Sequence, residues 1–122
     1  MELEHAAGQA AWSSTVTSDT TLISQLCEQI VDAVHPRRII LFGSRARGDS
    51  RSESDVDLLI VAPSTQPQWQ RTAMLYRLLA GAGVAKDLVW WTPEEIEEWR
   101  GVKNHFINRV LREGKLIYEE SS

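Results

Sequence analysis

The sequence predicts an α/β fold in which a small mixed β-sheet carries helices packed on one face. Short β-rich runs bounded by turn residues alternate with longer segments whose apolar residues recur at helical spacing. The length of 122 residues fits one compact domain, because single domains most often contain about 100 to 150 residues. A hydrophobic content of 43% is enough to form a core without disulfide bonds.

The first expected element is a helix that begins near Ser18 and ends before Pro36. Residues 1–17 are rich in Ala, Ser and Thr without a regular period, so we expect a flexible N-terminal arm followed by one domain over residues 18–122. Ser18 and Asp19 belong to the residue types that cap helices. The apolar stripe of this helix comprises Leu22, Ile23, Leu26, Cys27, Ile30, Val31 and Val34.

Three β-rich runs predict the strands of the sheet. Arg38–Phe42 ends at a glycine, Val56–Val61 follows a polar stretch, and Lys86–Trp91 follows a glycine-rich turn. Between the first two runs, Ser44–Asp49 is expected to form a single helical turn and Ser50–Ser54 a loop.

The remaining elements are mostly helical. Gln68–Ala80 has amphipathic spacing and runs into glycines. The motif Thr92-Pro93-Glu94-Glu95 combines an N-cap, a proline at the first helical position and a capping box, so it predicts a helix that ends near Gly101. A last helix is expected before Gly114, and a short strand over Leu116–Tyr118. The stripe of that helix comprises Phe106, Ile107, Val110 and Leu111.

Composition narrows the classes of partner and the compartment. The formal net charge of -4 and the pI near 5.3 disfavour binding to a phosphodiester backbone, so no direct DNA binding is expected. Cys27, the only cysteine, falls within an apolar stripe, which indicates a packed thiol and a reducing compartment. Neither a signal peptide nor a membrane span is recognised, so we expect a cytoplasmic protein without membrane contact.

Two carboxylates stand at the start of the second β-rich run. On a strand, Asp55 and Asp57 would point to one face, whereas Val56 and Leu58 would point to the other. Carboxylates this close repel each other unless a cation lies between them or one is protonated. Mg²⁺ prefers hard oxygen ligands that it shares with substrate phosphates. The sequence therefore predicts a site for Mg²⁺, or for Mn²⁺ in its place.

The turn that follows the first β-rich run is suited to binding phosphate. Gly43 lets the backbone approach a ligand closely, and Ser44 adds a hydroxyl donor at the start of a helical turn. In this arrangement the β- and γ-phosphates of a nucleotide would lie on Gly43 and Ser44, leaving the α-phosphorus open to attack. Arg45 and Arg47 could bind phosphate too, but each could equally pair with a surface carboxylate.

Asp87 is the candidate for a third carboxylate, because it stands at the start of the third β-rich run. It would help to hold a second cation or accept the proton of an attacking hydroxyl. The alternative is an ion pair with its neighbour Lys86. A P-loop is excluded, since Asp49 occupies the position where that motif requires a phosphate-binding lysine.

Together these motifs resemble the nucleotidyltransferase superfamily that includes DNA polymerase beta. The resemblance is closest to its small stand-alone members, the minimal nucleotidyltransferases of the antitoxin type. It extends from the first helix to Tyr118 and leaves out only the N-terminal arm. The residues that carry it are Gly43-Ser44-Arg45-Ala46-Arg47-Gly48, Ser54-Asp55-Val56-Asp57-Leu58 and Asp87.

The resemblance implies a fold, a reaction and a partner. It assigns phosphate binding to Gly43 and Ser44, and divalent metal binding to the Asp55, Asp57 and Asp87 carboxylates. Many proteins of this type transfer AMP from ATP to a tyrosine of a HEPN-domain toxin, which they thereby restrain. By this resemblance the chain is an antitoxin that uses ATP, modifies a HEPN-domain protein and assembles into a homo- or hetero-oligomer.

Two other functions remain open at this stage. One is nucleotidyl transfer to a small molecule, although enzymes of that kind usually carry an additional helical domain for the acceptor. The other is an antitoxin that inhibits by contact alone and whose nucleotide site is vestigial. The presence of Asp55, Asp57 and Asp87 speaks against a decayed site.

Overall fold

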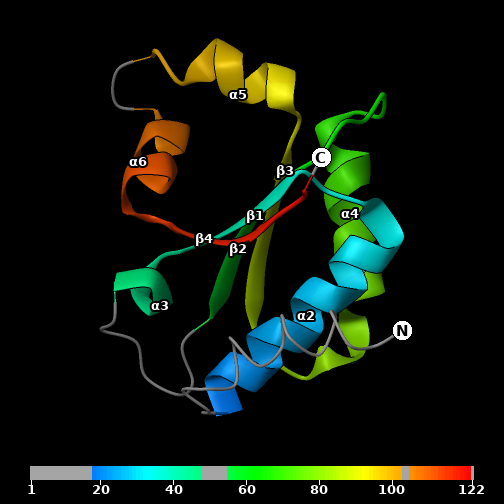
Figure 1. Ribbon diagram of the computed structural model, residues 1–122. Helices are drawn as coiled ribbons and strands as arrows, with labels where there is room; N and C mark the ends of the chain where they lie inside the picture. The colour runs from blue at the N-terminus through cyan, green and yellow to red at the C-terminus, as the bar shows by residue number, and fades with distance from the viewer. Residues whose placement is uncertain (1–17, 48–54, 103–104, 122) are drawn as a thin grey trace.

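The structure is a computed structural model that describes residues 18–47, 55–102 and 105–121. The predicted arm over residues 1–17 and the predicted loop Ser50–Ser54 lie outside the described residues. The described residues form five α-helices, a short 3-10 helix and four strands (Figure 1). In chain order these are α2 Ser18–Val34, β1 Arg38–Phe42, α3 Ser44–Arg47, β2 Val56–Val61, α4 Gln68–Leu78, η1 Ala80–Ala82, β3 Lys86–Trp91, α5 Pro93–Trp99, α6 Phe106–Glu113 and β4 Lys115–Glu119.

The four strands form one mixed sheet in the order β3-β2-β1-β4, which confirms the predicted fold class. β1 is antiparallel to both β2 and β4, whereas β2 and β3 are parallel. A parallel pair needs a crossover connection, and α4 supplies it. The two parallel strands therefore begin at the same end of the sheet, where their first residues lie side by side.

Helices α2 and α4 cover one face of the sheet and bury the larger core (Figure 1). Alternate residues of β2, namely Val56, Leu58 and Ile60, point into this core and are fully buried. Leu26 and Ile30 of α2 pack against them, as the helical spacing predicts. The predicted packing of helices on one face holds for these two long helices.

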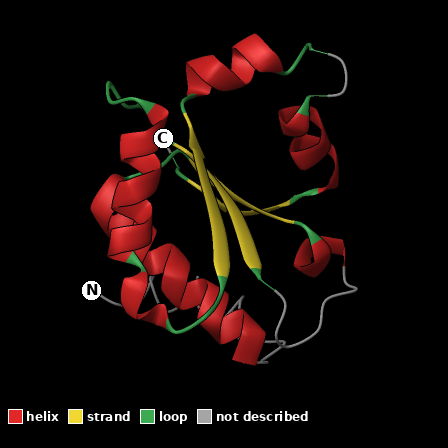
Figure 2. Cartoon of the chain, turned by 180° about the vertical axis from the view of Figure 1, so that it is seen from behind, coloured by secondary structure: helices red, strands yellow, loops and turns green. Residues whose placement is uncertain are grey.

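The other face of the sheet also carries helices, which the sequence analysis did not anticipate. Leu59 and Val61 of β2 pack with Ile96 of α5 and with Ile107 and Val110 of α6. Figure 2 shows α6 on the opposite side of the sheet from α2 and α4, and α5 across the end of the sheet. β2 is thus buried on both faces, which explains why its sequence is an unbroken apolar run after Asp57.

The element boundaries follow the predicted signals closely. β1, β2 and β3 have the predicted bounds. α4 ends at Leu78, two residues before the predicted end, because the chain tightens into a 3-10 turn that Gly83 closes in a left-handed conformation. β4 is longer than predicted at both ends. No helix in the described ranges is long and apolar enough to cross a membrane.

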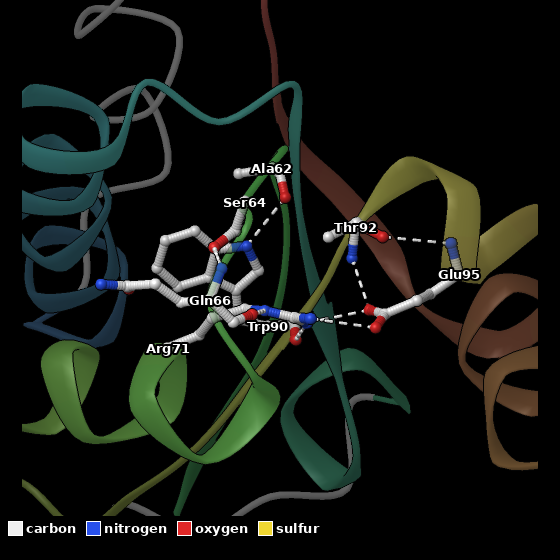
Figure 3. Close-up of polar contacts among 7 residues, drawn as sticks. All are labelled: Ala62, Ser64, Gln66, Arg71, Trp90, Thr92 and Glu95. Atoms are coloured by element: carbon white, nitrogen blue, oxygen red, sulfur yellow. Dashed lines mark hydrogen bonds and ion pairs between the residues drawn. The ribbon is translucent and has the colours of Figure 1, made fainter.

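The start of α5 is held by a buried arginine of α4 (Figure 3). Thr92 and Glu95 form the predicted capping box. Arg71, which is 5% exposed, donates to both carboxylate oxygens of Glu95 at 2.8 and 3.0 Å. It also donates to the carbonyl oxygens of Gln66 and Trp90. The hydrogen bonds from Arg71 hold the pKa of Glu95 below its ordinary value. Together with the bonds to the carbonyl oxygens, they connect α4, β3 and α5.

Two side chains of α4, Arg71 and Tyr76, cover the outer edge of β3. β3 is an edge strand, so half of its backbone groups point away from β2. The Tyr76 hydroxyl accepts from the backbone N–H of Leu88 at 2.9 Å, and Arg71 donates to the carbonyl oxygen of Trp90 at 3.1 Å. α4 therefore satisfies outward-facing groups of β3 with its own side chains.

Replacing Arg71 with Met should lower the free energy of unfolding by about 2 to 3 kcal/mol. This is less than removing one partner of a fully buried ion pair costs, because Glu95 is partly exposed. Urea unfolding followed by circular dichroism measures the loss. The matched control is Arg100→Met, which removes the exposed ion pair with Glu97 and should cost about 0.5 kcal/mol or less. Equal losses in the two variants would contradict the role assigned to Arg71.

Candidate active site

The predicted site residues converge on one end of the sheet, on the face that carries α5 and α6. Phe42, the last residue of β1, pairs with Asp57 of β2. Asp57 in turn pairs with Asp87 of β3. Asp57 and Asp87 share the side-chain face of Leu59, Val89 and Trp91. The register thus brings the second and third carboxylates onto neighbouring strands.

Asp55 lies directly before β2 and is exposed, so it stands at the open end of this row. The backbone N–H of Val56 donates to the carbonyl oxygen of Ala85, which holds the start of β2 beside the start of β3. Asp57 is half-buried and Asp87 is exposed. Asp57 is therefore the least exposed of the three carboxylates.

Gly43 lies directly against the Asp57 carboxylate. Its φ angle is +77°, in the left-handed region that favours glycine. A Cβ atom at this position would overlap the Asp57 carboxylate, with the Cγ atom of Asp57 only 3.1 Å away. The turn and the carboxylate are thus in contact, which the sequence analysis could only predict from their separate motifs. The Ser44 side chain lies outside the described part of the structure.

The environment of Asp57 is unfavourable to its charge. Partial burial, together with the neighbouring Asp87 and Asp55 carboxylates, raises the pKa of Asp57 from 3.8 to about 6, against the opposing effect of Arg45 and Arg47. The repulsion between carboxylates is the one that the sequence analysis expected at this position. A bound cation would relieve it.

The donor set fits a hard divalent cation that is shared with substrate phosphates. Mg²⁺ is commonly bound by one or two carboxylates plus phosphate oxygens and water. Asp57 together with Asp55 or Asp87 provides carboxylates of this kind, beside Gly43, which has no side chain. Within residues 18–47, 55–102 and 105–121, no three Asp, Glu, His or Cys side chains are grouped tightly enough to hold a metal ion by themselves.

The Arg45 side chain lies between α3 and the residue that precedes β2. Its side chain is 8% exposed, and its Nε atom donates to the backbone carbonyl oxygen of Asp55 at 3.2 Å. The guanidinium therefore connects α3 with the residue that precedes β2. Phosphate binding by Arg45 stays a prediction, while this contact supports a role in positioning Asp55. Arg47, two residues on, is exposed.

A pocket of about 440 Å³ opens beside Gly43, between the end of β1 and α6. The sequence analysis did not single out its α6 side. Arg109 stands three residues after Phe106, so the two side chains are neighbours on the surface of α6. The lining residues are Phe42, Gly43, Arg47, Phe106, Arg109, Val110 and Glu113.

His105 has a structural role at the start of α6. Its Nδ1 atom accepts from the backbone N–H of Ile107, which caps α6. Its ring stacks on Trp99 of α5 at a centroid distance of 4.7 Å and meets the edge of Trp91 at 5.5 Å. These contacts place the start of α6 over the sheet.

Comparison with known proteins places the chain in a family. The nucleotidyltransferase domain family matches residues 22–116, so the chain belongs to this family. The match includes all the residues assigned to the site. A comparison with curated proteins finds no match.

Several solved structures share the fold. A predicted nucleotidyltransferase from Sulfolobus solfataricus is 23% identical with a TM-score of 0.60, over 82% of this chain and 79% of that one. A toxin-antitoxin structure with AMP-PNP is 21% identical with a TM-score of 0.59, over 80% and 73%. A mutant of the toxin-antitoxin MntA-HpeT is 18% identical with a TM-score of 0.57, over 80% and 73%. At these identities the likeness establishes the fold alone.

Replacing Gly43 with Ala should destabilise the protein by more than the strain of a left-handed backbone alone, because the added Cβ overlaps Asp57. If this turn binds the phosphates of ATP with Mg²⁺, the substitution should also abolish that binding. The matched control is Gly83→Ala, because Gly83 has a φ of +74° but nothing within 4 Å of its added Cβ. The control pays only the backbone strain, about 1 kcal/mol. Thermal unfolding and calorimetric titration with ATP and Mg²⁺ measure both effects. Equal behaviour of the two variants would show that the contact with Asp57 is unimportant.

Replacing Asp57 with Asn should stabilise the metal-free protein near neutral pH. A carboxyl whose folded pKa is raised contributes stability that is present at low pH and lost as the pH rises, here from about 4 through about 6. We expect a gain of about 1 kcal/mol at roughly pH 7.5, reduced by solvent screening, and none near pH 4. Urea unfolding with a chelator present measures it. Asp32→Asn, on the exposed side of α2, is the control, and a pH-independent gain at Asp57 would refute the explanation.

Proposed function

We propose that the protein is a metal-dependent nucleotidyltransferase that transfers AMP from ATP to a hydroxyl acceptor and releases pyrophosphate. The observation that carries this proposal is the contact between the Gly43 backbone and the Asp57 carboxylate, with Asp87 paired beside it. A glycine turn for phosphate and carboxylates for a cation thus lie next to each other. Membership of the nucleotidyltransferase domain family supports the same reaction.

Each residue has a separate task in this reaction. Gly43 and Ser44 hold the β- and γ-phosphates, while Asp55 and Asp57 hold Mg²⁺, which supplies charge neutralisation to the phosphates when bound. Asp87 lies one strand further along the sheet and accepts the proton of the acceptor hydroxyl or helps to hold a second cation. Arg45 keeps the Asp55 backbone against α3. Catalysis then depends on positioning and electrostatics rather than on a covalent intermediate with the protein.

The bond changes are those of a single displacement at phosphorus. The acceptor oxygen forms a bond to the α-phosphorus and loses its proton to Asp87. The bond between the α-phosphorus and the oxygen that bridges to the β-phosphate breaks, and pyrophosphate leaves with that electron pair. The products are AMP joined to the acceptor oxygen and free pyrophosphate, so charge and atoms balance.

The acceptor that we propose is a tyrosine of a HEPN-domain toxin, with this chain as the antitoxin. The support is the resemblance to minimal nucleotidyltransferases, together with the likeness to two toxin-antitoxin structures, one of them with AMP-PNP. A phenolic hydroxyl on a partner protein also suits a site whose Asp87 side is exposed. Transfer to a small molecule and inhibition by contact alone are the two competing functions.

The deciding experiment incubates the protein with radiolabelled ATP, Mg²⁺ and the protein encoded beside it. We expect the neighbour to gain one AMP, located by mass spectrometry on a tyrosine, and to lose its toxicity. The double variant Asp55→Ala with Asp57→Ala should reduce transfer by at least about a thousandfold, since it removes the carboxylates that bind the cation.

The controls separate the three functions. The Arg100→Ala variant, which changes only an exposed ion pair far from the carboxylates in the chain, should transfer AMP at the normal rate. Neutralisation of the neighbour by the double variant, without any adduct, would instead establish inhibition by contact. Labelling of a small molecule rather than of the neighbour would establish the small-molecule reaction.

A further inference from the structure

The pocket beside Gly43 lies on the opposite side of the phosphate turn from Asp87. In the sheet order, Asp87 of β3 is followed by Asp57 of β2 and then by β1, which ends next to Gly43. The pocket continues this direction, since Phe42 and α6 form its walls. Phe42 and Phe106 close its apolar side with an edge-to-face contact at 5.5 Å. The site therefore has an Asp87 end and a pocket end.

The two ends have opposite charge. The Asp87 end carries carboxylates, whereas Arg47 and Arg109 line the pocket from α3 and α6 against the single carboxylate Glu113. Arg109 and Glu113 are four residues apart on α6 and so lie on one helix face. The Glu113 carboxylate lies 3.7 Å from a guanidinium nitrogen of Arg112. Arg112 itself does not line the pocket. Arg109 is exposed and lines the pocket, so its guanidinium lies where an anion can reach it.

A displacement at phosphorus places the attacking and leaving oxygens roughly in line. If the acceptor hydroxyl approaches beside Asp87, the leaving pyrophosphate departs on the opposite side, past Gly43 and toward the two arginines. Arginine is well suited to phosphate oxygens, because its planar guanidinium can donate two parallel hydrogen bonds. The pocket, with a volume of about 440 Å³, lies on this side of Gly43.

We propose that Arg109 of α6 is a specificity-determining residue that binds the terminal phosphate of the nucleoside triphosphate and the pyrophosphate product. This inference rests on the proposed function for the orientation of the nucleotide. α6 contributes none of the predicted catalytic residues. Through Arg109, it would distinguish a nucleoside triphosphate from a monophosphate. Glu113 opposes the bound anion and limits its affinity.

The test measures binding by calorimetry with ATP and Mg²⁺, AMP and Mg²⁺, and inorganic pyrophosphate and Mg²⁺. Arg109→Ala should weaken ATP and pyrophosphate binding roughly tenfold, as expected for a lost charge-assisted hydrogen bond, and leave AMP binding unchanged. Arg109→Lys should restore part of the affinity. Glu113→Gln should tighten ATP binding, and Arg100→Ala, a matched change at an exposed arginine outside the pocket lining, should alter it by less than about twofold.

The outcomes distinguish this inference from the proposed function. Normal ATP and pyrophosphate binding by Arg109→Ala, or an equal loss of AMP binding, would overturn the role of Arg109 even if AMP transfer is observed. Pyrophosphate binding that depends on Arg109 without any AMP transfer by the wild-type protein would overturn the proposed reaction and keep the anion pocket. A wild-type protein that binds neither ATP nor pyrophosphate would overturn both.

Discussion

The register between β1, β2 and β3 is the constraint on which the rest of the structure depends. β2 is buried on both faces, with Val56, Leu58 and Ile60 in one core and Leu59 and Val61 in the other. A slip of one residue would exchange the two sets and turn Asp57 toward α2 and α4. The apolar packing of β2 thereby sets the positions of the polar residues at its start. Asp57 meets Gly43 and Asp87 because the hydrophobic residues that follow it can pack in only one register.

Assembly of the site works against the stability of the fold. Partial burial raises the pKa of Asp57, and the neighbouring Asp87 and Asp55 carboxylates raise it further. A purely structural protein would gain by replacing them, whereas a site for a cation and phosphates needs this concentration of negative charge. Burial of the apolar side chains on both faces of β2 offsets the free-energy cost of these charges. This separation, with packing along the strand and chemistry at its end, is typical of sites built on a rigid sheet.

The second face connects the distant end of the sheet with the pocket. Arg71 holds Glu95 at the start of α5, and Trp99 at the end of α5 stacks on His105, which caps α6. α6 in turn carries Arg109 beside Gly43. Contacts thus run from the ion pair between Arg71 and Glu95, through α5 and His105, to the pocket beside Gly43. These contacts explain why two short helices, each too short to be stable in isolation, hold defined positions.

The sequence by itself determined the fold class, the bounds of β1, β2 and β3, the capping box of α5 and the two motifs at Gly43 and Asp57. Each of these depends on residues close together in the chain, through side-chain alternation, helical spacing or turn chemistry. Only the tertiary structure decided that Gly43 touches Asp57, that Arg45 is buried against the Asp55 backbone, and that α6 brings Arg109 to the phosphate turn. These are contacts between elements, and they follow from strand register and helix packing, which no local pattern specifies.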